Sequence, residues 1–298
     1  MVKVLLFGST GVIGREIARA FTRNGHEVYG LTRREAKAKE LQQEEINGVV
    51  GDISDPSTWL PLLKIVSVII DASADTKDLA GATANLLHTI ESAVKDYPDK
   101  RFTFIYTSGV WVYGDRRSPY ETVDETDPLN PIPLIDWRPD IEQRVIRNRS
   151  YDGVVIRPGL VSGRSGSIFT FWFEAVEKGQ VTLINDDQTR AAPVHTDDLA
   201  EAYVNAVERI ELTKGQVFNV ANPQTENVTD IIKAMARAAK VDVKISYKPA
   251  SNPFEVAQGL YSPVFDIRKA KKLLGFEQRR PGVVDGMERY YKAWKAHQ

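Results

Sequence analysis

The decisive stretch of this sequence is Val2–Gly14, which reads VKVLLFGSTGVIG. Its apolar start, Val2–Phe7, predicts a buried strand, and the amphipathic stretch Gly14–Asn24 predicts a helix. The three glycines between them have the spacing of a turn in which backbone N–H groups and a helix N-terminus meet a pyrophosphate. A second strand-like run, Glu27–Leu31, supplies the context that separates this pattern from an ordinary glycine turn. We therefore expect a dinucleotide site formed by Gly8, Ser9, Thr10, Gly11, Val12, Ile13 and Gly14.

The bulk composition is that of an ordinary globular protein. The 298 residues are 42% hydrophobic and 27% charged, the formal net charge is -1, and there is no cysteine. This charge balance favours no nucleic-acid partner, and the missing cysteines exclude disulfides and thiolate metal sites. The longest apolar runs are shorter than the roughly 20 residues of a membrane span. A strand that starts at Val2 leaves no room for a secretion signal. We expect a cytoplasmic protein that does not bind membranes.

Strand-like and helix-like segments alternate through most of the chain, which predicts an α/β fold with a doubly wound parallel sheet of the Rossmann type. Further apolar, β-rich runs follow the first two at Gly48–Gly51, Ile65–Asp71, Phe102–Thr107, Gly153–Arg157 and Gln216–Val220. Further helical patterns lie at Arg34–Gln43, Thr76–Tyr97, Pro139–Arg149 and Thr196–Ile210.

Two regions interrupt this alternation. Pro119–Arg138 contains four prolines and predicts a long loop over the sheet edge, a length that is more often functional than not. The second region predicts a small C-terminal α/β lobe, with helices at Ile168–Lys178, Thr229–Lys240, Arg268–Leu274 and Val283–Ala296 and a strand at Val243–Tyr247. We expect residues 1–165 and 193–222 to form the nucleotide-binding domain, and residues 166–192 and 223–298 to form a substrate lobe.

The residues after the second strand indicate which dinucleotide is bound. An NAD site usually places an acid there to bind the ribose 2′-hydroxyl. This chain instead has Thr32, Arg33 and Arg34, and no acid before Glu35. Guanidinium groups suit a 2′-phosphate, so the pattern favours NADP(H); the alternative is a solvated basic start of a helix.

The next two strand ends provide further candidates for cofactor contacts. Asp52 ends the third predicted strand, where its carboxylate could accept the adenine amino group with Ile53 against the ring. Asp52 could equally be a turn or helix-capping residue. Small residues after the fourth strand, Ala72, Ser73 and Ala74, leave room for the ribose and nicotinamide.

Five motifs follow one another along the chain. They are the Gly8–Gly14 pattern, Gly51-Asp52, YTSGVWVYG at Tyr106–Gly114, VIRPG at Val155–Gly159 and VHTDDLA at Val194–Ala200. Together they resemble the extended short-chain dehydrogenase/reductases, the group that includes NAD-dependent epimerases and dehydratases. The resemblance implies that Ser108 orients the substrate oxygen and that Arg157, Pro158 and Gly159 line the nicotinamide and substrate side. It also implies a structural role for the His195 segment, with Thr196 or Asp197 as a helix cap, and a homodimer as one expected assembly.

The chain departs from that family at its catalytic pair, Tyr-x-x-x-Lys. The corresponding region, Pro133–Gln143, reads PLIDWRPDIEQ and contains neither tyrosine nor lysine. Matching the family's downstream glutamate to Glu142 puts Leu134 at the tyrosine position and Arg138 at the lysine position, although Trp137 could take the tyrosine position instead. The chain therefore resembles an atypical member of the group.

Hydride transfer to a carbonyl needs a proton and stabilisation of the developing oxyanion. We expect Ser108 to donate a hydrogen bond, Tyr113 to act as the acid and Arg138 to be the nearby cation. Tyr113 could instead be a packing residue, and Arg138 could form a surface ion pair with Asp136, Asp140 or Glu142. No ligand spacing supports a metal site.

Substrate contacts are expected from Trp111, Trp137, Phe169 and Trp172, which would favour an apolar or aromatic substrate, and from Arg190 near the substrate or its phosphate. The aromatic side chains could instead pack between the two lobes, and Arg190 could pair with Asp187. The leading hypothesis is an NADP(H)-dependent oxidoreductase that acts on a small carbonyl compound. The alternatives are a nucleotide-sugar epimerase or dehydratase, and a non-catalytic NADP(H)-binding sensor or scaffold.

Overall fold

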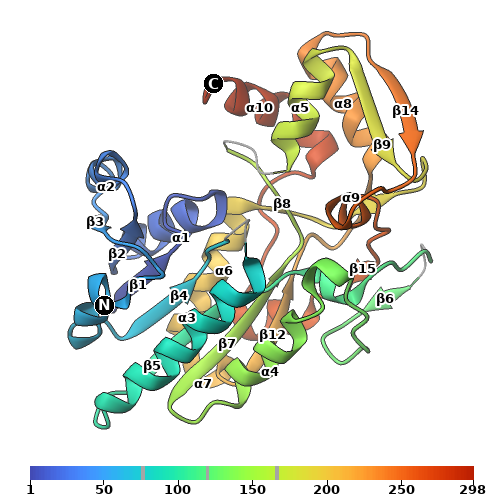
Figure 1. The fold of residues 1–298 in the computed structure, drawn as a ribbon. Helices are drawn as coiled ribbons and strands as arrows, with labels where there is room; N and C mark the ends of the chain where they lie inside the picture. Colours follow the sequence, from blue (N-terminus) through green and yellow to red (C-terminus); the bar gives the residue numbers. More distant parts are fainter. Residues whose placement is uncertain (75–77, 119–120, 165–167) are drawn as a thin grey trace.

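The computed structural model describes residues 1–74, 78–118, 121–164 and 168–298, and a seven-stranded sheet forms its centre (Figure 1). The strand order is β12-β7-β5-β4-β1-β2-β3, and every neighbouring pair is parallel. This confirms the predicted Rossmann-type sheet, and all seven strands coincide with predicted runs. Their bounds are β1 Lys3–Phe7, β2 Glu27–Thr32, β3 Asn47–Val50, β4 Val68–Asp71, β5 Phe102–Thr107, β7 Tyr151–Pro158 and β12 Gln216–Val220.

Alternating side chains of these strands supply two separate cores, one on each face of the sheet. On β1, Val4 and Leu6 belong to one core, and Leu5 and Phe7 belong to the other. The first core is covered by α1 (Val12–Arg23), α2 (Glu35–Gln42) and α6 (Thr196–Glu208), and the second by α3 (Leu79–Ala93) and α4 (Arg138–Arg147). Because both faces of the sheet are covered, the central strands such as β1, β4 and β5 are mostly apolar runs, which is why the sequence predicts them, whereas β3 at the edge is partly exposed.

A third hydrophobic core lies at one end of the molecule, where Figure 1 shows α5, α8, α10 and two strands gathered together. The elements are α5 (Phe169–Glu177), β9 (Gln180–Ile184), α8 (Val228–Ala239), β14 (Lys244–Lys248) and α10 (Val283–Lys295), with β14 parallel to β9. Trp172, Phe173, Met235 and Trp294 are among its buried residues. The division into two domains with the boundaries given above stays a prediction.

The remaining elements are short, and most were not predicted. They are β8 (Leu160–Ser162) with β11 (Pro193–His195), β10 (Arg190–Ala191) with β13 (Glu226–Asn227), β6 (Thr122–Val123) with β15 (Val264–Phe265), α7 (Ile210–Thr213) and α9 (Pro253–Gln258). The helix predicted at Arg268–Leu274 is a single turn, Ala270–Leu274. The predicted starts at Thr76 and Pro119 lie outside the described residues. Within the described ranges, no helix is both long and apolar enough to cross a membrane.

Candidate coenzyme and substrate site

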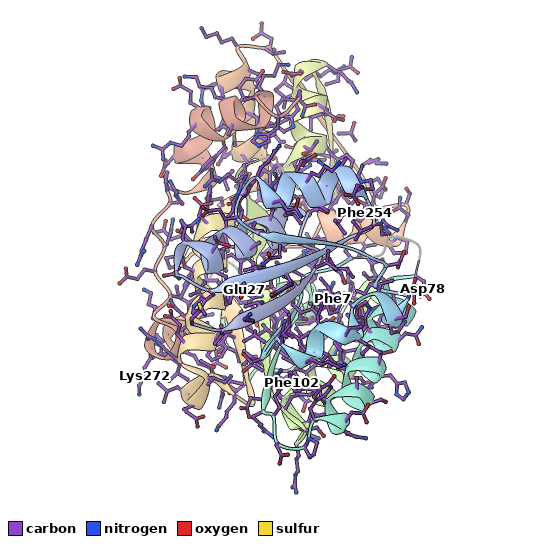
Figure 2. All side chains as sticks on the ribbon, turned by 90° about the vertical axis from the view of Figure 1, so that its left-hand side faces the viewer. Phe7, Glu27, Asp78, Phe102, Phe254 and Lys272 are labelled. Carbon is purple, nitrogen blue, oxygen red and sulfur yellow. The ribbon has the colours of Figure 1, made fainter. Side chains whose placement is uncertain are left out.

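The candidate site lies at the carboxyl ends of the central strands. β1 has β2 on one side and β4 on the other, and the connection leaving β1 leads to β2 whereas the connection leaving β4 leads to β5, so the two depart in opposite directions and open a crevice between β1 and β4. In Figure 2, Phe7 at the carboxyl end of β1 lies between Glu27, at the amino end of β2, and Asp78, which caps α3. The residues that surround this edge come from β1, β2, β4, β5 and the first turn of α4.

The Gly8–Gly14 segment, called the glycine turn below, has the close contacts that its sequence predicts. Gly8 has a φ of +77°, and a Cβ there would lie 2.3 Å from the carbonyl oxygen of Ala72. A Cβ at Gly14 would lie 2.1 Å from the carbonyl oxygen of Gly8. Neighbouring backbone atoms therefore leave no room for a side chain at Gly8 or Gly14. Gly11, by contrast, is exposed at the start of α1.

The start of α1 has the features of an anion site. Gly11 is the N-cap, no side chain caps the helix, and no acidic residue lies in its first turn. Thr10, Val12 and Ile13 are half-buried around it. Helix N-terminal N–H groups and the helix dipole favour a phosphate at such a position. The residues present therefore fit the pyrophosphate of a dinucleotide.

The side chain of Ser9 holds the glycine turn in place and is not free to contact a cofactor. It is fully buried, and its Oγ donates a hydrogen bond of 2.8 Å to the carbonyl oxygen of Leu31. The hydroxyl therefore ties the glycine turn to the end of β2, and only the backbone of Ser9 remains for the cofactor.

The end of β2 places two cations beside the glycine turn. Arg33 and Arg34 are exposed, and within the described ranges neither has a carboxylate within salt-bridge distance. Thr32 is buried, and its Oγ1 accepts a hydrogen bond of 3.5 Å from the Arg34 N–H. Two guanidinium groups without a carboxylate partner among the described residues thus lie at the end of β2.

Asp52 forms a local turn. Its Oδ1 accepts hydrogen bonds from the Ser54 N–H at 2.9 Å and the Ser54 hydroxyl at 2.7 Å. These bonds, with the charge of Arg33, lower the pKa of the Asp52 carboxyl. The carbonyl oxygen of Ile53 accepts a hydrogen bond from the Trp59 indole. Both residues are therefore engaged in shaping the loop, and their contacts with adenine stay a prediction.

β4 ends in the small residues that the sequence indicates, with Ala72 half-buried and Ser73 and Ala74 exposed. The residue before them, Asp71, was not predicted as part of the site. It is only 3% exposed, and burial raises the pKa of its carboxyl. The signal in the sequence was a single charge at the end of an otherwise apolar strand, VIID.

Ser108, Gly109, Trp137 and Arg138 form what we call the β5–α4 corner. Ser108 is buried, and its Oγ has no hydrogen-bond partner among the described residues, nor has the Nε of Arg138. A Cβ built on Gly109 would lie 3.3 Å from a terminal nitrogen of Arg138. The predicted surface ion pair of Arg138 does not form with Asp136, Asp140 or Glu142. Ser108 and Arg138 therefore supply uncommitted donors at one corner.

Tyr113 lies away from this corner in a buried network. It is fully buried, its hydroxyl receives a hydrogen bond of 2.6 Å from Arg157, and it donates one to the Asp124 carbonyl oxygen at 3.0 Å. The Asn219 side chain bonds the same hydroxyl. Burial raises the pKa of Tyr113 to about 12. This placement argues against the expected role of Tyr113 as the acid, because its proton has no path to the cleft.

Arg157 also departs from its expected place beside the nicotinamide. It is 2% exposed and forms a buried ion pair with Glu142 of α4, with Nε bonds of 3.0 and 3.2 Å to the two carboxylate oxygens. Pro158 and Gly159 follow at the end of β7, and both are buried. A Cβ on Gly159 would lie 2.2 Å from the Ala192 carbonyl oxygen, so close backbone packing explains this glycine.

The expected aromatic set divides between two places. Phe169 and Trp172 are buried in the C-terminal core with their rings edge to face at 5.3 Å, so packing, not the cleft, accounts for them. Trp111 and Trp137 are half-buried, and the Arg138 guanidinium lies 5.5 Å from the Trp137 ring centre. Arg190 bonds the hydroxyl and carbonyl oxygen of Thr225 instead of Asp187, and lines an open pocket of about 450 Å³.

His195, rather than Thr196 or Asp197, caps α6. Its Nδ1 accepts a hydrogen bond from the Asp197 N–H at 3.1 Å, and burial lowers the pKa of the imidazole to about 4. The Thr196 hydroxyl donates to the carbonyl oxygen of Val12, which joins α6 to the start of α1. Among the described residues there is no group of three His, Asp or Glu side chains placed to hold a metal ion.

The chain is similar to known proteins in sequence and in structure. Residues 4–221 match the model of the NAD dependent epimerase/dehydratase family. The 2-alkyl-3-oxoalkanoate reductase of Stenotrophomonas maltophilia is 24% identical over 299 residues, which cover 92% of this chain and 88% of that protein. The photosystem II assembly factor Ycf39 of Synechocystis is 25% identical over 249 residues, covering 83% and 71%.

Among solved structures, the UDP-glucose 4-epimerase of Thermotoga maritima, in a structure with UDP-glucose, has a TM-score of 0.83 at 18% identity over 99% of both chains. The UDP-glucuronic acid 4-epimerase of Bacillus cereus, solved with UDP-glucuronic acid and NAD, has a TM-score of 0.81 at 19% identity, covering 99% of this chain and 100% of that one. At these identities the structural likeness establishes the fold alone.

Proposed function

Because the chain belongs to the NAD dependent epimerase/dehydratase family, we propose that it is an NADP(H)-dependent oxidoreductase that acts on a small carbonyl compound. The observation that carries the proposal is the pair of exposed arginines, Arg33 and Arg34, which stand at the end of β2 without a carboxylate partner in the described part of the chain. A guanidinium group binds a phosphate through two parallel hydrogen bonds, whereas an acid in this place would repel it.

Each part of the coenzyme has residues to hold it in this proposal. The glycine turn and the start of α1 would hold the pyrophosphate. Arg33 and Arg34 would bind the adenosine 2′-phosphate, and Ala72, Ser73 and Ala74 would leave room for the nicotinamide half. The coenzyme would supply hydride transfer to or from the carbon that carries the substrate oxygen.

The chain's own residues act on that oxygen. Ser108 and Arg138 have donors without a partner in the described ranges, and they are placed to stabilise negative charge on the oxygen. Arginine does not release a proton at neutral pH, so Arg138 is a fixed cation and not the acid. Trp111 and Trp137, both half-buried nearby, favour a substrate with an apolar body.

The coenzyme part is tested by titration with NADPH and NADH, followed by nicotinamide fluorescence. The wild-type chain is expected to prefer NADPH. The double variant R33A/R34A should lose about 10- to 100-fold in NADPH affinity, the effect of one to two charge-assisted hydrogen bonds, while NADH affinity stays the same. Lys39→Ala, which removes a charge from an exposed position on α2, is the matched control. Equal affinity for both coenzymes in the wild type would contradict the NADP(H) assignment.

The reaction is tested with a panel of carbonyl compounds, measured by NADPH consumption at 340 nm. Among the relatives, one is named a 2-alkyl-3-oxoalkanoate reductase, so 2-alkyl-3-oxoalkanoates belong in the panel. Nucleotide sugars belong in a parallel thermal-shift assay. Stabilisation by a nucleotide sugar without carbonyl reduction would favour an epimerase or dehydratase instead.

A non-catalytic NADP(H) sensor is the second candidate, and one observation favours it. The start of α4 has no tyrosine, and the nearby Tyr113 is buried and fully engaged. Tight NADPH binding without turnover of any carbonyl compound or nucleotide sugar would favour this role.

A further inference from the structure

Asp71 is a buried carboxylate that connects the two halves of the proposed site. It is the last residue of β4, paired with Phe7 of β1 on one side and Tyr106 of β5 on the other. Asp71 is 3% exposed and Tyr106 is 3% exposed. A carboxylate at this depth is costly unless it has partners, so its surroundings need an explanation.

One set of contacts ties Asp71 to the glycine turn. Its Oδ1 accepts hydrogen bonds from the Ser73 N–H at 3.0 Å and the Ser73 hydroxyl at 2.6 Å. The Ala72 N–H donates to the Phe7 carbonyl oxygen at 3.1 Å. A Cβ built on Gly8 would lie 2.9 Å from the Ser73 Cα. The loop held by Asp71 therefore packs directly against the turn that is proposed to bind the pyrophosphate.

The other surroundings include a cation, Arg138 on α4, whose charge acts on both Asp71 and Tyr106. Yet no salt bridge within 4.0 Å joins Asp71 to Arg138 in the described ranges. The Arg138 Nε and the Tyr106 hydroxyl are buried there without hydrogen-bond partners. Asp71 thus balances the charge of Arg138 and leaves its donors uncommitted.

We propose that Asp71 is a positioning residue of the coenzyme site: its negative charge balances Arg138 and opposes the coenzyme phosphates, so that neutralising Asp71 strengthens dinucleotide binding. The inference rests on the proposed NADP(H) binding. It concerns charge alone, because an asparagine would keep the acceptor for both Ser73 hydrogen bonds.

The sign of the pH dependence follows from the groups that face Asp71. These are Arg138 from α4, Tyr106 from β5 and Tyr203 from α6, beside Ser73 on its own segment. Arginine keeps its charge at all accessible pH values, and burial raises the pKa of both phenols, so neither ionises near neutrality. Burial also raises the pKa of Asp71. Protonation of Asp71 as the pH is lowered therefore adds to NADP⁺ affinity, and it begins at a higher pH than for an ordinary aspartate.

The test compares NADP⁺ dissociation constants of the wild type and Asp71→Asn by titration calorimetry between pH 5 and pH 8. At pH 8 the variant should bind NADP⁺ about 3- to 10-fold more tightly, the effect of removing one charge at a partly screened distance. The ratio of the two constants should fall toward one as the pH is lowered and Asp71 takes up its proton.

Two further variants separate charge from structure. Asp152→Asn removes a carboxylate at the start of β7, the opposite edge of the sheet, and should leave the affinity unchanged. Ser73→Ala removes a hydrogen bond but keeps the charge of Asp71, and should not tighten binding. Each variant is checked for folding by thermal unfolding. Unchanged or weaker binding by a folded Asp71→Asn, with wild-type binding intact, would overturn the inference alone. A wild type that binds neither NADP⁺ nor NADPH would overturn the proposed function with it.

Discussion

The glycine turn and the β5–α4 corner lie at the same edge of the sheet, but backbone atoms shape the first and side chains shape the second. In the glycine turn, backbone atoms make the decisive contacts, at 2.3 and 2.1 Å from the positions that side chains would occupy. In the corner, long side chains determine the geometry, and Arg138 is 3.3 Å from the space that a Cβ on Gly109 would fill. A turn made of backbone tolerates almost no substitution, whereas a corner made of side chains can be altered while the fold stays intact. The following experiments test that difference.

The largest effect is expected from Glu142→Ala, directly behind the corner. Glu142 is fully buried and pairs with Arg157, so the substitution leaves a buried guanidinium without its counter-charge. We expect a loss of about 3–5 kcal/mol in the free energy of unfolding, measured by urea denaturation. The double variant E142M/R157M should lose much less, since no charge is left unpaired. A loss below 1 kcal/mol in the single variant would show that the fold tolerates the loss of the Glu142–Arg157 ion pair.

A direct comparison of the two regions is Gly14→Ala against Gly109→Ala. The first places a methyl group against the backbone of Gly8, and the second places it against a flexible arginine side chain. We expect the first to cost about 3 kcal/mol of stability and to abolish coenzyme binding, and the second to cost less than about 1 kcal/mol. Urea denaturation and NADPH fluorescence measure both. Equal costs would remove the distinction between backbone and side-chain construction.

His195 caps α6, the helix that contacts the start of α1, and its burial makes the stability of the fold depend on pH. Burial lowers the pKa of His195 to about 4, so the folded chain does not take up a proton that the unfolded chain binds near pH 6.5. Stability is therefore expected to fall as the pH drops from 6.5 toward 4, by about 3 kcal/mol from this residue. His195→Asn, which can still cap the helix, should remove that slope in urea denaturation at four pH values. A variant with the wild-type slope would assign the acid sensitivity to other groups.

The smallest effect is expected from Tyr113→Phe. The change removes a hydroxyl that bonds Arg157, Asn219 and the Asp124 carbonyl oxygen, at a cost of about 1 kcal/mol in unfolding free energy. Coenzyme affinity and any carbonyl turnover found in the panel should stay within about twofold of the wild type, because the hydroxyl does not reach the corner. A folded variant that has lost turnover would restore Tyr113 as the acid.

The same contrast explains what could be predicted from the sequence. Every strand of the central sheet was located, because parallel strands buried on both faces are mostly apolar runs, and the exposed edge strand β3 still carries the pair Val49-Val50. The short pairs such as β10–β13 were missed, because two-residue strands form only where tertiary contacts bring them together. The spacing of Gly8 and Gly14 was sufficient for the glycine turn, since the backbone path alone requires those residues.

The corner could be predicted only in part. The sequence indicated Ser108 and Arg138, but not that Tyr113, five residues after Ser108, turns into the core. The direction of the Tyr113 side chain depends on a short helical turn, Val110–Tyr113, and on a partner far away in the sequence, Asn219. Phe169 and Trp172 were likewise expected at the cleft, because aromatic composition does not say which neighbour a ring will face. Asp71 was visible as a lone charge, but only the register of three strands shows what it connects.

The order of strands in the sheet has a consequence for synthesis of the chain. One edge strand, β12, begins at Gln216, and within the described part of the chain it pairs with β7 alone. While the ribosome is making residues before Gln216, β7 can pair with β5 but presents an open edge on its other side. Open edges invite pairing with other chains, and parallel sheets with distant partners fold slowly. A nascent chain stalled in the α6 region should therefore be prone to aggregation, and should lose that tendency once β12 has left the exit tunnel and docked on β7.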